Sequence, residues 1–172
     1  VDLEALARAH LRLRERSGVS LTLTVFSASA RPAPYSEIQV DPGTSLIRGL
    51  GPKAIGKPFF VGAAILEPEA LSELQSVEPA EFVPKILLPA IHAGKAGAFM
   101  SQGLWYDVGS PDLWLHTHSD LIEKLETGRD LPGSWRSRIE SENIRIAQNL
   151  WISKRSPRSI GFGRLAGPAY WD

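Results

Sequence analysis

The sequence predicts a mixed α/β fold, and three observations lead to this prediction. Stripes of apolar residues at helical spacing alternate along the chain with short runs that are apolar or β-branched. Turn residues such as Asp41-Pro42-Gly43-Thr44 separate those runs. The 172 residues are 43% hydrophobic, which is enough to build a core. Strands and helices in this order favour an α/β sheet.

Each element of the first half is predicted from its own residues. Apolar spacing indicates a helix from residue 3 to about Ser17-Gly18, with Asp2 as its N-cap. Apolar residues that alternate with Ser and Thr over 19–26 predict a buried strand. Short strands are expected at 35–40 and 45–50, joined by the Asp41 turn, and a core strand is expected at 59–66.

The second half continues the pattern as far as residue 130. We expect helices at about 68–74 and 81–93, strands at 96–101 and 104–108, and a helix from about Pro111 to Glu126. From Leu131 onward, Pro132-Gly133-Ser134 interrupts the chain, and apolar residues then alternate in short pairs. These features predict one domain over residues 1–130 and a small appendage of short strands over residues 131–172.

Composition excludes several classes of protein. Nineteen Lys and Arg balance nineteen Asp and Glu, so no excess of positive charge points to nucleic acid or an anionic membrane. No stretch approaches the ~20 apolar residues of a membrane span, and the N-terminal helix is too charged for a signal peptide. The chain has no cysteine, which excludes disulfides and thiolate metal sites. We expect a cytoplasmic protein with neither nucleic acid nor membrane as a partner.

The most informative segment is Trp105-Tyr106-Asp107-Val108-Gly109-Ser110-Pro111. The carboxylate of Asp107 ends a predicted apolar strand, and Gly109 and Pro111 follow it as a tight turn and a helix start. Ligands of open α/β sheets bind at strand ends, so Asp107 is a candidate binding residue. The alternative is that Asp107 only caps the turn or the helix that follows.

Three segments in sequence order resemble the sugar-1-phosphate nucleotidyltransferases. They are Phe60-Val61-Gly62 with Ile65-Leu66-Glu67-Pro68-Glu69, then Leu87-Leu88-Pro89-Ala90-Ile91, then the Trp105 segment. The resemblance runs from Asp2 to about Leu121. It is strongest for NDP-sugar synthases of the hexose-1-phosphate guanylyl- or uridylyl-transferase type, such as mannose-1-phosphate guanylyltransferases. It implies the C-terminal part of a Rossmann-like, mixed-sheet domain, followed in this family by a β-helix-like coil. It also implies formation of an NDP-sugar and pyrophosphate from a sugar 1-phosphate and an NTP.

The resemblance assigns roles to individual residues. Asp107 matches an aspartate that binds Mg²⁺, an ion that takes carboxylate and phosphate oxygens. Tyr35 and Ser36 match a Tyr-Gly pair that approaches the sugar, with Ser36 in place of the glycine. Gly62 matches a glycine under the hexose ring. A lysine of the family meets the sugar phosphate, and we take Lys53 for this role while Lys57 stays open.

Two family segments are missing from these residues. Neither the Gly-rich G-x-G-T-R-L loop for the nucleotide phosphates nor the N-G-D segment with the first metal aspartate occurs. We therefore expect a partial nucleotidyltransferase that is inactive alone. The alternative is a noncatalytic module that binds a sugar phosphate or another subunit, and self-association into a homo-oligomer is left open.

Three further patterns have simpler explanations. Gly51 to Lys57 fits G-x-x-x-x-G-K, but Pro58 and an apolar strand follow where a phosphate loop needs Ser or Thr and a helix. His116-Thr117-His118-Ser119 resembles the first metal motif of polymerase-and-histidinol-phosphatase phosphoesterases. In the expected helix, residues two apart point to different faces, so packing or surface histidines are preferred. The basic residues Lys154, Arg155, Arg158 and Arg164 are expected to form a solvated face rather than a phosphate site.

Overall fold

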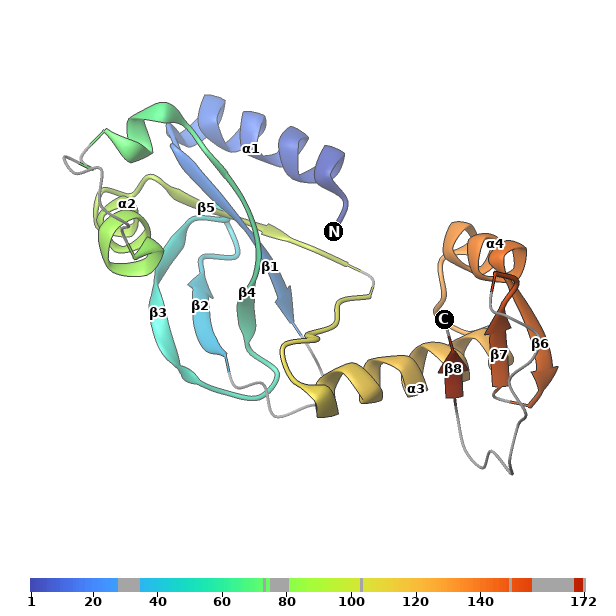
Figure 1. The fold of residues 1–172 in the computed structure, drawn as a ribbon. Coiled ribbons are helices and arrows are strands. Elements are labelled where there is room, and N and C mark those ends of the chain that lie inside the picture. The colour runs from blue at the N-terminus through green and yellow to red at the C-terminus, as the bar shows by residue number, and fades with distance from the viewer. Residues whose placement is uncertain are drawn as a thin grey trace. The chain divides into compact units, whose positions relative to one another are not determined.

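The computed structural model describes residues 1–27, 35–72, 74, 81–102, 104–148, 150–155 and 169–171. The chain forms two compact units, Val1–Gly103 (unit 1) and Leu104–Asp172 (unit 2) (Figure 1). The two units meet after Gly103, whereas the sequence predicts a domain boundary after residue 130. That domain boundary stays a prediction. Helices and a mixed sheet confirm the α/β class. No helix in the described ranges is long and apolar enough to cross a membrane.

Helix α1 (Leu3–Ser17) lies on one face of the main sheet of unit 1. The carboxylate of Asp2 accepts a hydrogen bond from the backbone N–H of Ala5 at 2.9 Å, which confirms the predicted N-cap. Gly18 ends the helix with a φ of 65°, in the left-handed region that favours glycine. The buried side of the helix consists of Leu6, Ala9, His10 and Leu13.

The main sheet has three strands in the order β4-β1-β5 (Figure 1). Its members are β1 (Leu21–Ser27), β4 (Pro58–Leu66) and β5 (Ala96–Met100). The central strand β1 pairs antiparallel with β4 and parallel with β5, so the sheet is mixed. Because side chains alternate between the two faces of a strand, a central strand buries both sets. In β1 these are Leu21, Leu23 and Val25 on one face and Thr22 and Thr24 on the other.

A separate antiparallel hairpin packs against the same core as the main sheet. It consists of β2 (Ser36–Val40) and β3 (Ile47–Lys53), and β3 extends three residues past its predicted end. The carboxylate of Asp41 shapes the turn, because Oδ1 accepts the N–H groups of Gly43 and Thr44 at 3.0 Å each. The buried core of unit 1 joins Ile38 and Ile47 of the hairpin to residues of β1, of β5 and of the helical segment 83–92: Leu21, Leu23, Val25, Leu87, Ala90, Ile91, Ala96 and Ala98.

The two predicted helices between β4 and β5 are present in altered form. The first is a single 3-10 turn over Pro68–Leu71. The second begins as a π-helical turn, Val83–Leu87, and continues as α2 (Leu88–His92). Pro89 has no N–H to donate to the preceding turn, which removes one bond of the regular helical ladder.

Unit 2 contains α3 (Pro111–Thr127), α4 (Gly133–Glu142) and a small sheet in the order β6-β7-β8. The strands are β6 (Asn143–Ala147), β7 (Leu150–Ser153) and β8 (Ala169–Trp171). Its core is formed by Ile122, Leu125 and Trp151, against which Leu131 and Ile139 pack. Short strands beyond residue 131 are therefore confirmed.

Two expectations for unit 2 are wrong. Residues 104–108 are not a strand and pair with no other strand in the described part of the chain. Instead, the hydroxyl of Tyr106 donates to the carboxylate of Asp120 on α3, so this segment is held by a helix side chain rather than by a ladder. Helix α4 was not predicted, because Pro132-Gly133 indicated a break. Its i,i+4 pairs Arg136–Glu140 and Arg138–Glu142 favour a helix after that break.

Candidate functional site

Ser36 and Lys53 are register partners at the open end of the β2–β3 hairpin. Directly opposed residues of an antiparallel pair have Cβ atoms about 4.5–5.5 Å apart. Both residues are exposed. Among the described residues, the ammonium group of Lys53 forms no ion pair. The pairing thus brings together two of the residues that the sequence singled out, with a solvent-facing cation beside a hydroxyl.

Tyr35, just ahead of β2, is fixed against the start of β4. Its ring stacks on Phe59, with centroids 4.7 Å apart and an interplanar angle of 17°. Phe59 is 2% exposed, so it gives Tyr35 a rigid base within the core. Tyr35 thus packs on β4, while the next residue, Ser36, pairs with Lys53 of β3.

Gly62 occupies a β-bulge in β4. Leu23 of β1 pairs with Ala64 and Val25 pairs with Phe60, so β4 has extra residues at this point. The φ of Gly62 is 88°, and a Cβ added to it would meet no atom within 4 Å. Glycine is needed here for its backbone conformation, and the surface above it is open.

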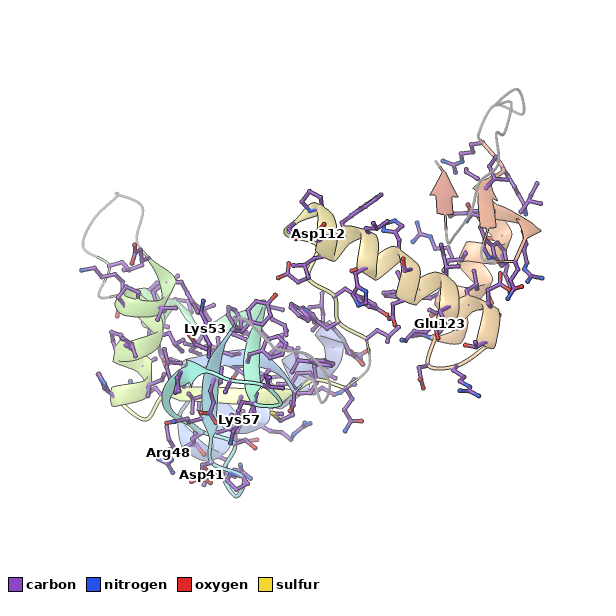
Figure 2. The ribbon with its side chains drawn as sticks, turned by 90° about the horizontal axis from the view of Figure 1, so that it is seen from below. Asp41, Arg48, Lys53, Lys57, Asp112 and Glu123 are labelled. Atoms are coloured by element: carbon purple, nitrogen blue, oxygen red, sulfur yellow. The ribbon has the colours of Figure 1, made fainter. Side chains whose placement is uncertain are left out.

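The other cations of the hairpin region are paired with carboxylates. Lys57 Nζ lies 3.7 Å from Glu37 Oε1, and Arg48 donates to Asp41 Oδ2 through Nε and a terminal nitrogen at 3.3 and 3.0 Å. Arg48 lowers the pKa of Asp41 from 3.8 to about 2, helped by the N–H and hydroxyl of Thr44. Figure 2 shows Arg48 and Asp41 together at the turn end of the hairpin, away from Lys53.

Asp107 belongs to unit 2, in the turn that precedes α3. Its Oδ1 accepts the N–H of Gly109 at 2.8 Å. The cap of α3 is Ser110, whose hydroxyl accepts the N–H of Leu113 at 3.3 Å, and Pro111 is the first helical residue. Asp107 is half-buried and shapes this turn, which was the structural alternative to a binding role.

The residues present fit a magnesium ion only in part. Mg²⁺ is usually held by one or two carboxylates together with water and substrate phosphates. Asp107 offers one carboxylate, and in the described ranges no group of three or more His, Asp or Glu side chains is placed to hold a metal. This donor set suits an ion held mainly by phosphate oxygens, and it does not suit an all-protein cage.

The histidine pair lies on α3, as the helical expectation required. Nδ1 of His118 donates to the carbonyl oxygen of Trp114 at 2.9 Å, and the two ring centroids are 4.0 Å apart. His116 is exposed.

After Lys57 the chain enters strand β4 directly, so the rejection of a phosphate loop is confirmed.

The basic residues near the C-terminus are described only in part. Nζ of Lys154 donates to the carbonyl oxygens of Ser141 and Glu140 at 2.6 and 3.4 Å, at the end of α4. A cation at this place stabilises the C-terminus of a helix. Arg158 and Arg164 lie outside the described residues.

Sequence reasoning missed a buried polar cluster that joins α1 to the main sheet. His10 is 3% exposed; its Nε2 lies 2.9 Å from Glu67 Oε1 and its Nδ1 lies 2.9 Å from Thr22 Oγ1. Arg14 reaches the same Glu67 oxygen at 3.2 Å. The hydrogen bond from His10 lowers the pKa of Glu67, and the charge of Arg14 adds to this effect. The signal in the sequence was a histidine inside the apolar stripe of α1.

No protein-family model and no curated protein sequence matches the chain. One similar solved structure is that of a Bacillus anthracis protein described as a glucose-1-phosphate thymidylyltransferase, in complex with sucrose. Sequence identity is 13% and the TM-score is 0.48, over 63% of this chain. This chain spans 46% of the length of that protein.

Proposed function

We propose that unit 1 binds a sugar 1-phosphate, and that it forms the sugar-phosphate side of a nucleotidyltransferase. The observation that carries this proposal is the pairing of Ser36 with Lys53 next to the stacked Tyr35. Ser36 and Lys53, separated by 17 positions in sequence, are both exposed and lie directly opposite each other in the hairpin. The sequence resemblance assigns Tyr35 and Ser36 to the sugar, and Lys53, with Lys57 as the open alternative, to its phosphate.

Charge favours Lys53 over Lys57 as the phosphate-binding residue. Lys57 is already opposite the carboxylate of Glu37, whereas Lys53 has no ion pair among the described residues. A lysine ammonium with no carboxylate partner is available to a phosphate, and hydrogen bonds between charged partners are stronger than neutral ones. The hydroxyl of Ser36 offers a further donor on the same surface.

In the proposed reaction, an oxygen of the sugar phosphate attacks the α-phosphorus of an NTP. The new bond joins that oxygen to the α-phosphorus, the bond from the α-phosphorus to the bridging oxygen breaks, and pyrophosphate leaves. Lys53 would bind and orient the attacking phosphate, and Tyr35 would hold the sugar side in place. When bound, Mg²⁺ neutralises phosphate charge. The resemblance assigns Asp107 of unit 2 to this ion.

Binding is tested by titrating the full chain with glucose 1-phosphate and mannose 1-phosphate in a calorimeter. One of them is expected to bind, and Lys53→Ala should weaken that binding by about 10-fold or more, the effect of one charge-assisted hydrogen bond. Lys57→Ala is the matched control and should change affinity much less. Equal losses in the two variants would contradict the role of Lys53, and no binding of either sugar would contradict the proposal.

A noncatalytic sugar-phosphate-binding module is the second candidate. It rests on the same exposed pair of Ser36 and Lys53, which can bind a phosphate without transferring it. A pyrophosphate-release assay with each NTP, the sugar phosphate that binds and Mg²⁺ tests transfer by this chain. Release above the background of a Lys53→Ala variant contradicts the module, whereas binding without release fits both the module and a partial transferase that is inactive alone.

A further inference from the structure

Strand β5 is an outer strand of the main sheet, and part of its outer edge has no neighbour. Strand β1 lies along one edge of β5. Along the other edge, the described residues form a single bridge, between Leu46 and Gly97. An open strand edge presents N–H and C=O groups that can pair with another chain, and sheet edges often carry a proline or a charge that prevents this. Strand β5 has neither.

The bridge stops because the chain turns away from β5 at Ser45. In a hydrogen-bonded antiparallel pair, the two residues exchange both of their backbone hydrogen bonds. Ala98 donates its N–H to the carbonyl oxygen of Ser45 at 2.8 Å, but the N–H of Ser45 donates to the carbonyl oxygen of Asp41 instead. The φ of Ser45 is 60°, which is a turn conformation and not a strand conformation. Beyond Ala98, no further pairing follows on this edge in the described residues.

Met100 carries the next backbone groups on the open edge. In a strand, the N–H and C=O of one residue point to one edge, and those of the next residue point to the other. The N–H of Ser101 donates to the carbonyl oxygen of Val25 on β1 at 2.8 Å, so the backbone of Met100 points away from β1. Met100 is also 44% exposed. Its N–H and C=O can therefore form one complete antiparallel pair with an incoming strand.

A pocket of about 530 Å³ lies beside this edge, with more positive than negative charge in its wall. Arg16 donates to the carbonyl oxygen of Thr44 at 2.9 Å, and Arg12 forms no ion pair among the described residues. Glu15 is the single carboxylate against these two guanidinium groups. A second carboxylate would find charged donors here. The wall consists of Ala9, Arg12, Leu13, Glu15, Arg16, Ser45, Ala98, Phe99 and Met100.

We infer that an extended peptide binds to this edge as an added antiparallel strand, with one acidic side chain directed to Arg12 and Arg16. The antiparallel direction continues the line of the Leu46 bridge. Backbone bonds to Met100 supply affinity and the arginines select the acidic side chain, which is how roles divide when a peptide adds to a sheet edge. A peptide matches both the donor and the acceptor of Met100, whereas a simple anion matches only the donor. This inference is independent of the proposed sugar-phosphate site.

The probe is the blocked peptide acetyl-Thr-Val-Glu-Val-Thr-amide, whose β-branched residues favour an extended conformation. It is titrated into the ¹⁵N-labelled full chain. The peptide is expected to shift the amide resonance of Met100 saturably and to slow its hydrogen exchange. The amide of Ser101, which is already bonded to Val25, should exchange at nearly the same rate as before. The same peptide with Lys in place of Glu should bind about 2- to 5-fold more weakly, the usual effect of an exposed ion pair.

Two pairs of variants test the location. Met100→Pro removes the outward N–H without removing a bond to β1, a position at which a strand tolerates proline, and it should abolish binding. Met100→Ala keeps the N–H and should bind as the unmodified chain does. Arg12→Glu should reverse the preference in favour of the Lys peptide. Arg8→Glu changes the same charge on the same helix outside the pocket, and it should leave the preference unchanged.

The exchange rate of the Met100 amide in the unmodified chain gives the answer if Met100→Pro fails to fold. No saturable shift of Met100, binding that survives in a folded Met100→Pro, or equal affinities for the two peptides would each overturn the inference. A Met100 resonance that shifts with protein concentration alone would also overturn it, because a second copy of the chain would then occupy the edge.

Discussion

The imidazole of His10 joins helix α1 to the carboxylate of Glu67, 57 residues further along the chain, through a contact of 2.9 Å. A carboxylate accepts only, so Nε2 of His10 carries the proton in this contact. Its Nδ1 forms a second hydrogen bond with the hydroxyl of Thr22 on β1, at 2.9 Å. One buried side chain thus fixes the helix to both the central strand and the end of β4.

Replacement of His10 is expected to destabilise unit 1. His10→Ala would leave the buried hydroxyl of Thr22 and the carboxylate of Glu67 without this partner, at a cost of about 1–3 kcal/mol. Hydrogen exchange of the β1 amides measures the loss. Arg8→Ala on the exposed side of α1 removes only a surface pair with Glu4 and is the control. A His10 variant that exchanges no faster than the control would contradict a structural role for the cluster.

The stability of unit 1 is expected to depend on Asp41 in acid. Its pKa is lowered to about 2 in the folded chain, so its contribution is complete above 3.8 and is lost as the pH falls toward 2. Asp41→Asn should flatten the dependence of the unfolding free energy on pH in this window. Urea unfolding followed by β1 amide signals from pH 6 to pH 2 measures it. Glu15→Gln removes an exposed carboxylate of α1 as the control, and an equal change in slope there would count against Asp41.

A side chain at Gly62 is expected to strain the bulge of β4. Space is not limiting, but φ is 88°, so Gly62→Ala should cost about 1–2 kcal/mol through backbone conformation alone. Gly43→Ala is the matched control, since its φ lies outside that region and the added Cβ would meet only Asp41 Oδ1 at an ordinary 3.5 Å. The two unfolding free energies are compared by denaturant titration. Similar values for the two variants would show that the bulge does not require glycine.

Glu126 is expected to be a main stabilising contact of unit 2. Its carboxylate accepts from the guanidinium of Arg145 on β6 and from the indole of Trp151 on β7. Glu126→Ala would leave the buried indole N–H without this acceptor, at a cost of about 1–3 kcal/mol. All five tryptophans lie in 104–172, so tryptophan fluorescence during unfolding reports unit 2 alone.

The control for Glu126 is one turn earlier on the same helix. Glu123 is exposed, and Figure 2 labels it on α3. Glu123→Ala should change the fluorescence midpoint little. A midpoint for Glu126→Ala that coincides with it would show that the indole and the guanidinium find other partners.

The candidate residues of unit 1 show which parts of the site the sequence predicts and which depend on the structure. The resemblance selected Tyr35, Ser36, Lys53 and Gly62 without knowing that Ser36 and Lys53 are register partners. The sequence does not decide between Lys53 and Lys57, because the choice depends on which of them lies near a carboxylate. In the structure, Glu37 lies near Lys57. For Asp107 the sequence offered a binding role and a turn role, and the hydrogen bond to Gly109 shows the turn role directly.

The amino-acid sequence by itself determined the features whose hydrogen bonds close within a few residues. Asp2 caps α1, Gly18 ends it, Asp41 forms its turn and Ser110 caps α3, because each donor and acceptor pair is fixed by local spacing. Only the tertiary structure decided which segments find partners far along the chain. Residues 104–108 have strand-forming side chains but no neighbouring strand in the described ranges, and His10 gains its role from Glu67, because such contacts depend on how the elements pack.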